Sequence, residues 1–277
     1  MIFKLRRPDA DIAWKNPEIL KRFSRYRGII DNTQISRYLI AKTIKCDYNS
    51  NDSLEHLEKL LKQKSKEFNE VLNEDINSQK NRKFEEKSYI HLSKAIAYKY
   101  LENCKFCERR CGVNRIQGEK GFCHLDKDIY VSSAFLHWGE ESVLVPSGTI
   151  FFAGCNFGCV FCQNYDISNA WKGRRKIEDI AQKVDAKSLA TIAQKLVKNG
   201  GINLNWVGSD PIPCLHLILE SMQYQTMNIT QLWNSNFYLT EESLSLIIDF
   251  IDFWLPDLKY GNNKCAEKYS GIKHYWE

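Results

Sequence analysis

The feature that most constrains this sequence is an alternation of short β-rich runs with amphipathic helical patterns, which begins near Thr149. Between the runs, apolar residues recur at three- and four-residue steps, and Asp185 and Thr240 stand where helix N-caps are expected. Strands and helices that alternate in this way favour a parallel sheet with right-handed crossovers. The fold class is therefore predicted to be α/β. The predicted strands are residues 149–153, 202–207, 230–233 and 253–258.

Residues 1–102 have a different character and are predicted to form a mainly helical, basic extension. Apolar residues at helical spacing run from position 51 to 72, with Asp52 as the expected N-cap, and again from 89 to 101 after a polar stretch. The first 100 residues carry a net charge of +7, whereas the remainder carries −2. This surplus favours a solvated helix face, with contact to an acidic partner or nucleic acid as the alternative. The tightest basic cluster comprises Lys21, Arg22, Arg25 and Arg27.

The composition excludes several classes of protein. With 43% hydrophobic and 26% charged residues among 277, the chain is able to bury a core and is neither disordered nor fibrous in bulk. Its apolar runs fall short of the roughly 20 residues that a membrane span needs, and no secretory signal is evident. A soluble, cytoplasmic protein without a membrane partner is expected. Ten cysteines in a reducing compartment then indicate metal or redox chemistry rather than disulfides.

Three of these cysteines, Cys155, Cys159 and Cys162, follow the first predicted strand. Their spacing allows three thiolates at the carboxyl end of a strand to converge on one small inorganic centre. Thiolates suit zinc or an iron–sulfur cluster. A four-iron cluster held by three cysteines keeps one iron open to an added ligand, so three ligands indicate a reactive site. The alternative is a zinc knuckle or three buried cysteines.

The C-x-x-x-C-x-x-C run, with Phe161 before its last cysteine and a strand before its first, resembles the signature of the radical S-adenosylmethionine (radical SAM) superfamily. The likeness extends from Cys104 to Glu277 and points to a branch related to pyruvate formate-lyase activating enzyme, with a G-T-I-F-F strand and a C-Q-N tail. The resemblance implies an enzyme with a 4Fe–4S cluster held by the three cysteines. In that family the open iron binds SAM, which is cleaved reductively to methionine and a 5′-deoxyadenosyl radical.

Polar residues follow the other predicted strands, and the resemblance implies that they form the SAM pocket. Gly208, Ser209 and Asp210 stand where the family has a Gly-Gly-Glu-like turn that holds the SAM ammonium group, although Ser209 replaces the usual second glycine. Asp257 and Lys259 resemble a D-x-K motif beside the ribose. Active sites of barrels gather at such strand ends, and ordinary loop polarity is the alternative. The implied cofactor-binding residues are Phe161, Gln163, Gly208, Ser209, Asp210, Asn234, Asn236, Asp257 and Lys259.

The core of the family is a partial (β/α) barrel of six strand–helix units, of which about four are counted here. The resemblance therefore implies a radical SAM partial barrel over residues 148–277, truncated at its C-terminus and with an open parallel edge. Residues 103–147 form a cysteine-rich segment between this barrel and the helical extension. The catalytic competence of such a chain depends on how completely its pocket is walled.

A second group of cysteines lies in the cysteine-rich segment. Two of them form a C-x-x-C pair and the last follows a glycine-permitted turn, so the four make a complete ligand set for zinc or for a second iron–sulfur cluster. Arg109, Arg110 and Arg115 are expected to offset the charge of the thiolates. A structural tether and an electron relay are both open interpretations. The four cysteines are Cys104, Cys107, Cys111 and Cys123.

Two functions of different classes are compatible with these patterns. The first is a radical SAM enzyme that abstracts hydrogen from a protein, as a glycyl-radical-enzyme activase does, from an RNA base or from a small molecule. Flavodoxin or ferredoxin is the kind of electron donor that the resemblance implies. The second is a non-catalytic iron–sulfur or zinc binding module that acts as an electron carrier or nucleic-acid adaptor. Cleavage of SAM distinguishes the two.

Overall fold

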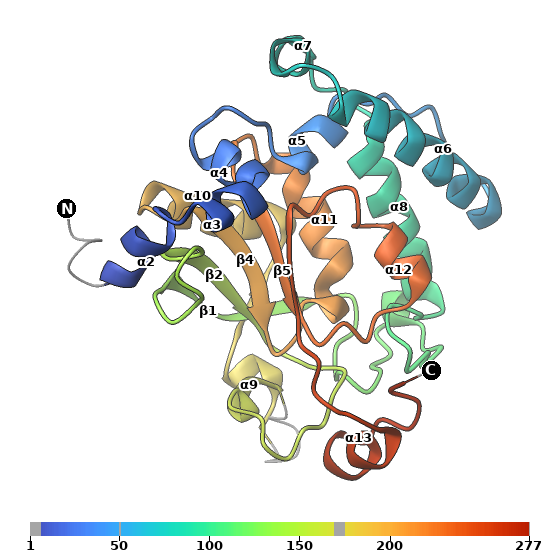
Figure 1. The fold of residues 1–277 in the computed structure, drawn as a ribbon. Coiled ribbons are helices and arrows are strands. Elements are labelled where there is room, and N and C mark those ends of the chain that lie inside the picture. The colour runs from blue at the N-terminus through green and yellow to red at the C-terminus, as the bar shows by residue number, and fades with distance from the viewer. Residues whose placement is uncertain (1–6, 50, 169–174, 277) are drawn as a thin grey trace.

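The computed structural model describes residues 7–49, 51–168 and 175–276 and has a six-stranded mixed sheet at its centre (Figure 1). The strands are β1 (Ile129–His137), β2 (Ser147–Phe152), β3 (Gln182–Val184), β4 (Asn203–Gly208), β5 (Thr230–Ser235) and β6 (Phe253–Pro256). Their order is β3-β1-β2-β4-β5-β6. The strands β2, β4, β5 and β6 are parallel, and β1 is antiparallel to β2 and β3. The predicted α/β class is confirmed.

The four predicted strands are the four parallel strands, with ends that differ from the prediction by at most two residues. The expectation of an all-parallel sheet is wrong, because β1 pairs antiparallel along β2 and covers that edge. The sequence pattern does not predict β1, since Ser132 and Ser133 interrupt its apolar run. The short strand β3 extends the sheet beyond β1. The cysteine-rich segment therefore contributes a strand to the sheet.

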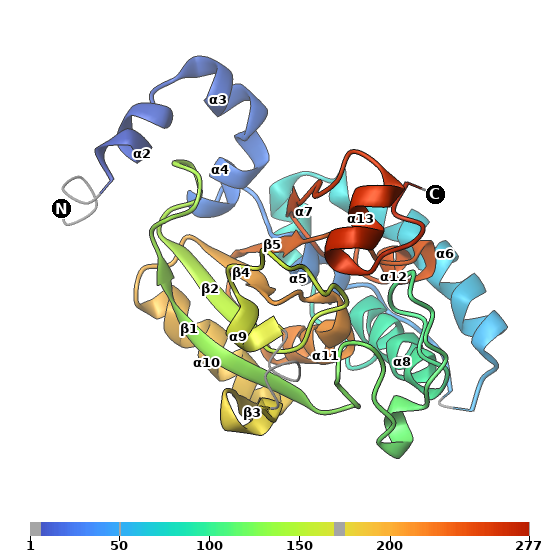
Figure 2. The ribbon, with the colours of Figure 1, turned by 90° about the horizontal axis from the view of Figure 1, so that it is seen from below.

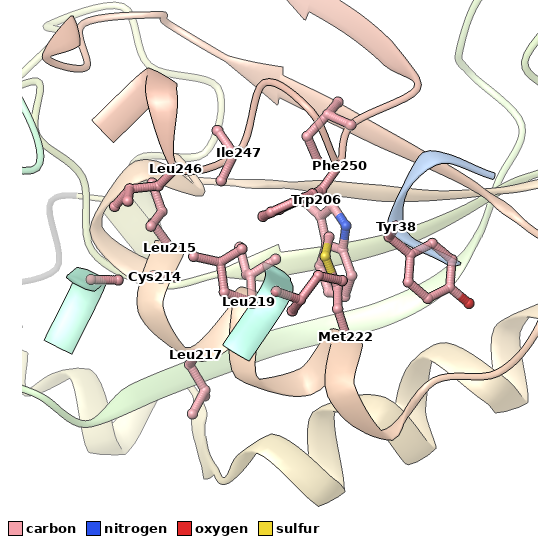
Figure 3. Packing of buried hydrophobic residues seen from close by; sticks show 14 of the residues in the cluster. Tyr38, Trp206, Cys214, Leu215, Leu217, Leu219, Met222, Leu246, Ile247 and Phe250 are labelled. Atoms are coloured by element: carbon pink, nitrogen blue, oxygen red, sulfur yellow. The ribbon is translucent and has the colours of Figure 1, made fainter. Parts of the chain in front are cut away.

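One face of the sheet is buried under helices from both halves of the chain (Figures 1 and 2). The helices α10 (Ala186–Lys198) and α11 (Leu215–Tyr224) pack together on the sheet side, and α8 (Tyr89–Glu102) packs on α11. Trp206 of β4 is fully buried near Leu219 and Met222 of α11 (Figure 3). Burial of such large apolar side chains contributes about 1.5–3 kcal/mol each. One hydrophobic core thus joins the helical extension to the sheet.

Local capping signals account for several helix starts. Among the described residues, the other α-helices are α2 (Pro8–Ala13), α3 (Pro17–Arg22), α4 (Ser24–Ile30), α5 (Arg37–Ala41), α6 (Leu54–Leu72), α7 (Ile76–Asn81), α9 (Tyr165–Ser168), α12 (Glu241–Ser245) and α13 (Asn263–Ser270). Asp185 and Thr240 cap α10 and α12 as predicted. The cap of α6 is Ser53, so the prediction of Asp52 is wrong by one residue. None of the described helices is both long and apolar enough to cross a membrane.

The opposite face of the sheet is closed at one end only. The helices α2, α3 and α4 lie across the amino-terminal ends of the parallel strands, whereas α9 and α13 lie at the other end (Figure 1). Tyr26 of α4 packs there with Leu144 and with Leu232 of β5. Phe253 of β6 stacks on Phe23, with ring centroids 5.5 Å apart. The N-terminal helices thereby form a floor at this end of the face.

The predicted basic cluster lies on α3 and α4, where acidic groups accompany it. Arg25 lies 3.8 Å from the buried carboxylate of Asp252, and Arg27 lies 2.7 Å from that of Asp31. Arg22 lies 3.9 Å from a glutamate one turn earlier on the same helix. Neighbouring carboxylates reduce the positive potential of the cluster. These pairs favour the solvated helix face over contact with nucleic acid.

Candidate functional site

The carboxyl ends of the four parallel strands meet at one edge of the sheet, and a cavity of about 590 Å³ opens there. Its wall includes the cysteine loop after β2 and the loops after β4, β5 and β6. All the residues that the resemblance implies for the first cluster and for SAM line this cavity. They are Cys155, Cys159, Phe161, Cys162, Gln163, Gly208, Ser209, Asp210, Asn234, Asn236, Asp257 and Lys259.

The cysteine loop is fixed from two sides. Gly154 has a φ of +86°, and a Cβ at this position would lie 2.7 Å from the carbonyl oxygen of Cys123. Only glycine accommodates both the conformation and this close approach. On the other side, the amides of Gly158 and Val160 donate hydrogen bonds to carbonyls near the end of α13. The loop is therefore anchored to the upstream cysteine segment and to α13.

Each of the three thiols in this loop has a polar neighbour. The Sγ of Cys155 accepts a hydrogen bond from the amide of Phe157 at 3.3 Å, and the Sγ of Cys159 accepts one from the hydroxyl of Ser270 at 2.8 Å. The Sγ of Cys162 lies 3.2 Å from a serine hydroxyl of α9. Amide and hydroxyl donors of this kind stabilise thiolate sulfur. The loop, α13 and α9 thus each place one polar group beside these sulfur atoms.

The surroundings of Cys155 disfavour a thiolate whose charge is not compensated. Burial raises the pKa of the Cys155 thiol well above its usual value, and the nearby Asp210 carboxylate raises it further. Cys155 is therefore a neutral thiol unless a cation compensates for its charge. Within residues 7–49, 51–168 and 175–276, no three His, Cys, Asp or Glu side chains are already arranged to hold a metal ion. The thiols share one cavity and must turn toward a common point to act as ligands.

Gly208, the last residue of β4, gives the following turn a backbone conformation that favours glycine, and Ser209 fits into this turn. Gly208 has a φ of +112°, and a Cβ here would lie 2.2 Å from the backbone nitrogen of Phe152. The amide and the hydroxyl of Ser209 both donate to the carbonyl oxygen of Phe152 at 3.0 Å. The serine side chain is thus engaged with β2. The replacement of glycine by serine at 209 is therefore compatible with the close approach of these two strands.

Asp210 is buried and ties the end of β4 to the end of β5. Its carboxylate accepts hydrogen bonds from the amides of Asn236 at 2.8 Å and Ile212 at 2.9 Å, and from the hydroxyl of Ser235 at 3.1 Å. Burial raises its pKa to about 6, although these hydrogen bonds act in the opposite direction. Asp210 therefore braces the cavity wall in addition to lining it, a role that the sequence pattern does not indicate.

The far side of the cavity carries a lysine–aspartate pair. The Nζ of Lys259 donates to the carboxylate of Asp257 at 2.8 Å. Burial acts to lower the pKa of Lys259, but the bond to Asp257 and the neighbouring acidic groups outweigh it and raise the pKa. Phe161 is half exposed at the cavity mouth, and its ring meets Tyr260 edge-on at 6.0 Å. This side of the cavity therefore has a positive charge on Lys259, a negative charge on Asp257 and an aromatic ring at Phe161.

The four upstream cysteines line a separate and much smaller cavity of about 20 Å³. Burial raises the pKa of Cys107 to about 12 and also raises that of Cys123. Arg115 is fully buried in the wall and donates to the carbonyls of Asp126 and Pro213. Its Nη1 is buried without a hydrogen-bond partner among the described residues. An unpaired guanidinium donor beside four thiols fits a site that carries negative charge, as thiolate ligands do.

The three arginines of this segment face in different directions. Arg109 lines the four-cysteine cavity and donates to the carbonyls of Asn156 and Gly271. Arg110 instead pairs with Glu108 and Glu242 on the surface and does not line that cavity. The prediction that Arg110 offsets the thiolate charge is therefore wrong, because acidic residues outside the cluster bind it.

Asn156, which the sequence analysis does not single out, links the two cysteine groups. It lines the four-cysteine cavity, and its carbonyl accepts from Arg109. Its side-chain oxygen accepts from Nδ2 of Asn236, a wall residue of the large cavity, at 2.7 Å. The two cavities therefore share a hydrogen-bonded partition. The position of Asn156 directly after Cys155, inside the cysteine motif, is the sequence feature that could have indicated its role.

Eight further residues that line the large cavity were not predicted, and three of them are polar residues with a clear structural position. Asn164, in the C-Q-N tail, donates from Nδ2 to the carbonyl of Gly208 at 3.1 Å and so joins the cysteine loop to the turn after β4. His137 and Glu140 line the cavity from the end of β1 and the loop after it. No local pattern marks them, because β1 itself is not predicted.

The fold and the site together define an α/β protein in which a mixed sheet carries two adjacent cysteine-lined cavities. No protein-family model matches the chain, and no solved structure matches it. The chain is 39% identical over 256 residues to the uncharacterized protein MJ0674 of Methanocaldococcus jannaschii, a match that covers 92% of this chain and 73% of that protein. The chain belongs to the family of that protein.

Proposed function

We propose that this chain is a radical SAM enzyme whose cluster is held by Cys155, Cys159 and Cys162. The observation that carries the proposal is that these cysteines and the strand-end residues implied for SAM line one cavity. The four parallel strands would form the partial radical SAM barrel, with β1 covering the β2 edge. The proposal rests on the motif resemblance and on this convergence.

In this proposal, different residues of the cavity would bind different groups of the cofactors. A bound 4Fe–4S cluster would supply the electron that cleaves SAM to a hydrogen-abstracting 5′-deoxyadenosyl radical. The turn at Gly208 and Ser209 would present backbone groups to the SAM ammonium, and Asp210 would hold that turn against β5. The pair Asp257 and Lys259 would lie beside the ribose hydroxyls. The floor formed by α2 to α4 would exclude water from the far end of the cavity.

The four-cysteine cavity is proposed to hold a second metal centre, either zinc or an iron–sulfur cluster. Its small volume and the unpaired Nη1 of Arg115 support a closed, anionic site. The contact between Gly154 and Cys123 places it directly against the cysteine loop. A redox-active cluster there would be well situated to pass electrons from a donor such as flavodoxin or ferredoxin. The substrate could be a protein, an RNA or a small molecule.

The test is the formation of 5′-deoxyadenosine by the full chain, reconstituted anaerobically with iron and sulfide and then reduced. The proposal predicts slow release of 5′-deoxyadenosine from SAM, and loss of this release in Cys159→Ala. Cys265→Ala, a cysteine of α13 outside the cavity, is the matched control and is expected to behave as the wild type. A reconstituted chain that binds iron but leaves SAM intact would favour the alternative, a non-catalytic iron–sulfur or zinc module.

A further inference from the structure

A second group of polar side chains lines the large cavity at the end opposite to the cysteines. His137 ends β1 and pairs in register with Ser147 at the start of β2, whereas Cys155 follows the end of β2. The length of β2 corresponds to about 17 Å. Glu140 lies in the loop after β1, and both His137 and Glu140 line the cavity. The cavity therefore has two ends with different chemistry.

The carboxylate of Glu140 is the centre of the second end. Its Oε1 accepts a hydrogen bond from Nδ2 of Asn205 at 2.9 Å and lies 3.2 Å from Nδ1 of His137. Both contacts use the same oxygen, so Oε2 is left to accept hydrogen bonds from a ligand. Burial raises the pKa of Glu140, and His137 acts in the opposite direction. The Glu140 carboxylate is therefore partly shielded from water, which strengthens a hydrogen bond from a ligand donor.

Asn205 holds Glu140 from behind the cavity wall. The residue is fully buried and is not among the residues that line the cavity, and its Oδ1 has no hydrogen-bond partner among the described residues. The Nδ1 of His137, which does line the cavity, is also buried without a well-directed hydrogen bond within the described part of the chain. Buried polar atoms in folded proteins are nearly always paired. The unpaired nitrogen of His137 beside Glu140 therefore indicates that the polar groups at this end of the cavity are incompletely satisfied.

Aromatic rings form a wall beside this carboxylate. Phe135 of β1 stacks on Phe151 of β2 with ring centroids 5.4 Å apart, and His137 meets Phe151 edge-on at 6.2 Å. Phe135 is 44% exposed although it is a large apolar side chain on a central element of the fold. Such rings attract flat groups and cations to their faces. The wall and the carboxylate of Glu140 therefore favour the same kind of ligand, one with a positive charge.

The loop that carries Glu140 is held by the N-terminal helical region. The guanidinium of Arg7 donates to the carbonyls of Trp138 and Glu140. The carboxylate of Asp9 accepts from the hydroxyl of Ser142 in the same loop. These bonds fix the backbone on both sides of Glu140. The carboxylate is therefore positioned before any ligand arrives.

We propose that this end of the cavity binds a cationic nitrogen group, an ammonium, amidinium or guanidinium, carried on a flat or apolar body. The carboxylate of Glu140 matches N–H donors, and the ring face of Phe151, which also lines the cavity, favours the positive charge. This ligand is the substrate of the enzyme, an assignment that rests on the proposed function. The binding of the cation itself requires only the residues of this end.

The experiment is a ligand-observed NMR titration of the metal-free full chain with benzamidine, and with benzoate as a comparator of the same shape and opposite charge. Benzamidine is expected to bind and benzoate is not. Glu140→Gln retains the shape of the side chain and its acceptor for Asn205 but removes the charge, and it should weaken benzamidine binding at least about tenfold. Glu241→Gln, on the exposed surface of α12, is the matched control and should bind as the wild type does.

Thermal unfolding checks that each variant is folded. If Glu140→Gln does not fold, Phe151→Leu carries the same test, because it shortens the aromatic wall while keeping the carboxylate, and weaker binding is again expected. Benzoate binding as tightly as benzamidine, no binding of benzamidine, or equal affinity in the wild type and Glu140→Gln would overturn the inference. Failure to cleave SAM would overturn the proposed function and the assignment of the ligand as its substrate, but not the binding of the cation, since the titration contains neither metal nor SAM.

Discussion

The two cysteine groups of this protein lie side by side yet differ in the space around them. Cys155, Cys159 and Cys162 line a cavity of about 590 Å³, whereas the four upstream cysteines line one of about 20 Å³. The first group shares its cavity with the polar ends of several strands. The second is enclosed by aromatic rings and the buried guanidinium of Arg115.

The number of cysteines in each group and the volume of the cavity beside it lead to the same expectation for the function of that group. If the three cysteines hold a four-iron cluster, one coordination position stays open, and the large cavity gives an added molecule room to reach it. If the four upstream cysteines hold a metal, they complete its coordination, and the small cavity leaves no room for a further molecule. We therefore expect chemistry at the first group and structural support or electron transfer at the second.

The largest expected effect comes from removing a ligand of the open site. Cys155→Ala should abolish the change that SAM causes in the spectrum of the reconstituted protein, because the cluster loses one of three ligands. Metal at the upstream cysteines should be retained. Absorption and iron analysis of the anaerobic protein provide the measurement, and Cys265→Ala serves as the control. A full SAM response in Cys155→Ala would contradict the division between the two groups.

The reciprocal change is Cys107→Ala in the closed site. Loss of its metal should make residues 104–126 accessible to protease, since Arg115 is the only fully buried residue between positions 108 and 124 and metal binding supplies folding free energy. The SAM-responsive iron should persist when the cluster is reduced chemically. Limited proteolysis with and without chelator, combined with metal analysis, measures both effects. Equal protease resistance of the wild type in both conditions would show that the closed site holds no structural metal.

A substitution at Gly154, where the cysteine loop touches the upstream cysteine segment, should lower the stability of the protein. Gly154→Ala places a Cβ 2.7 Å from the carbonyl oxygen of Cys123 at a φ of +86°, and such strain should lower the free energy of unfolding by about 2–4 kcal/mol. Urea unfolding of the anaerobically reconstituted chain gives this value. Gly261→Ala is the matched control, because a Cβ there meets no atom within 4 Å. Equal destabilisation by the two substitutions would argue against a close contact at Gly154.

The remaining prediction concerns the pH dependence of stability, to which Asp210 of the open cavity contributes. Burial raises the pKa of Asp210, and that of Asp252, to about 6, compared with about 3.9 in an unfolded chain. Because the folded state then holds the proton more tightly, the free energy of unfolding should fall as pH rises from about 4 to about 6, by up to about 3 kcal/mol for each group. Above about pH 6 the dependence should level off.

Asp210→Asn removes one of these two ionisable groups. The decrease in the free energy of unfolding between about pH 4 and about pH 6 should therefore become smaller but should not disappear. Urea unfolding of the metal-free chain at several pH values between about 4 and about 7 measures the difference. Asp257→Asn, whose carboxylate is exposed, serves as the control. An unchanged pH dependence in Asp210→Asn would mean that this carboxylate is not buried in solution.

Features set by neighbouring residues were predictable from the sequence. The caps at Asp185 and Thr240 depend on residues within one helical turn, and the parallel strands follow from continuous β-rich runs. The spacing of the cysteines is likewise local, which is why the motif identified the loop that lines the cavity. The capping residue Ser53 was missed because the adjacent Asp52 is an equally good candidate by type.

Features set by distant contacts were not predictable. Arg110 turns away from the cysteines because Glu242, 132 residues later, pairs with it. His137 and Glu140 enter the cavity because β1 pairs antiparallel with β2 and because Arg7 holds the loop between them. These contacts depend on the assembled fold, and no spacing within a short window of sequence reports them.

The central claim is that the cluster at Cys155, Cys159 and Cys162 has an open iron that binds SAM, whereas the upstream site does not. The most direct measurement is electron paramagnetic resonance of the reduced, reconstituted chain with SAM labelled with ¹⁵N in its amino group and ¹⁷O in its carboxylate. The account predicts hyperfine coupling from both labels in the wild type and in Cys107→Ala, and none in Cys155→Ala. Coupling that persists in Cys155→Ala, or no coupling in a wild type that carries a reduced four-iron cluster, would contradict it.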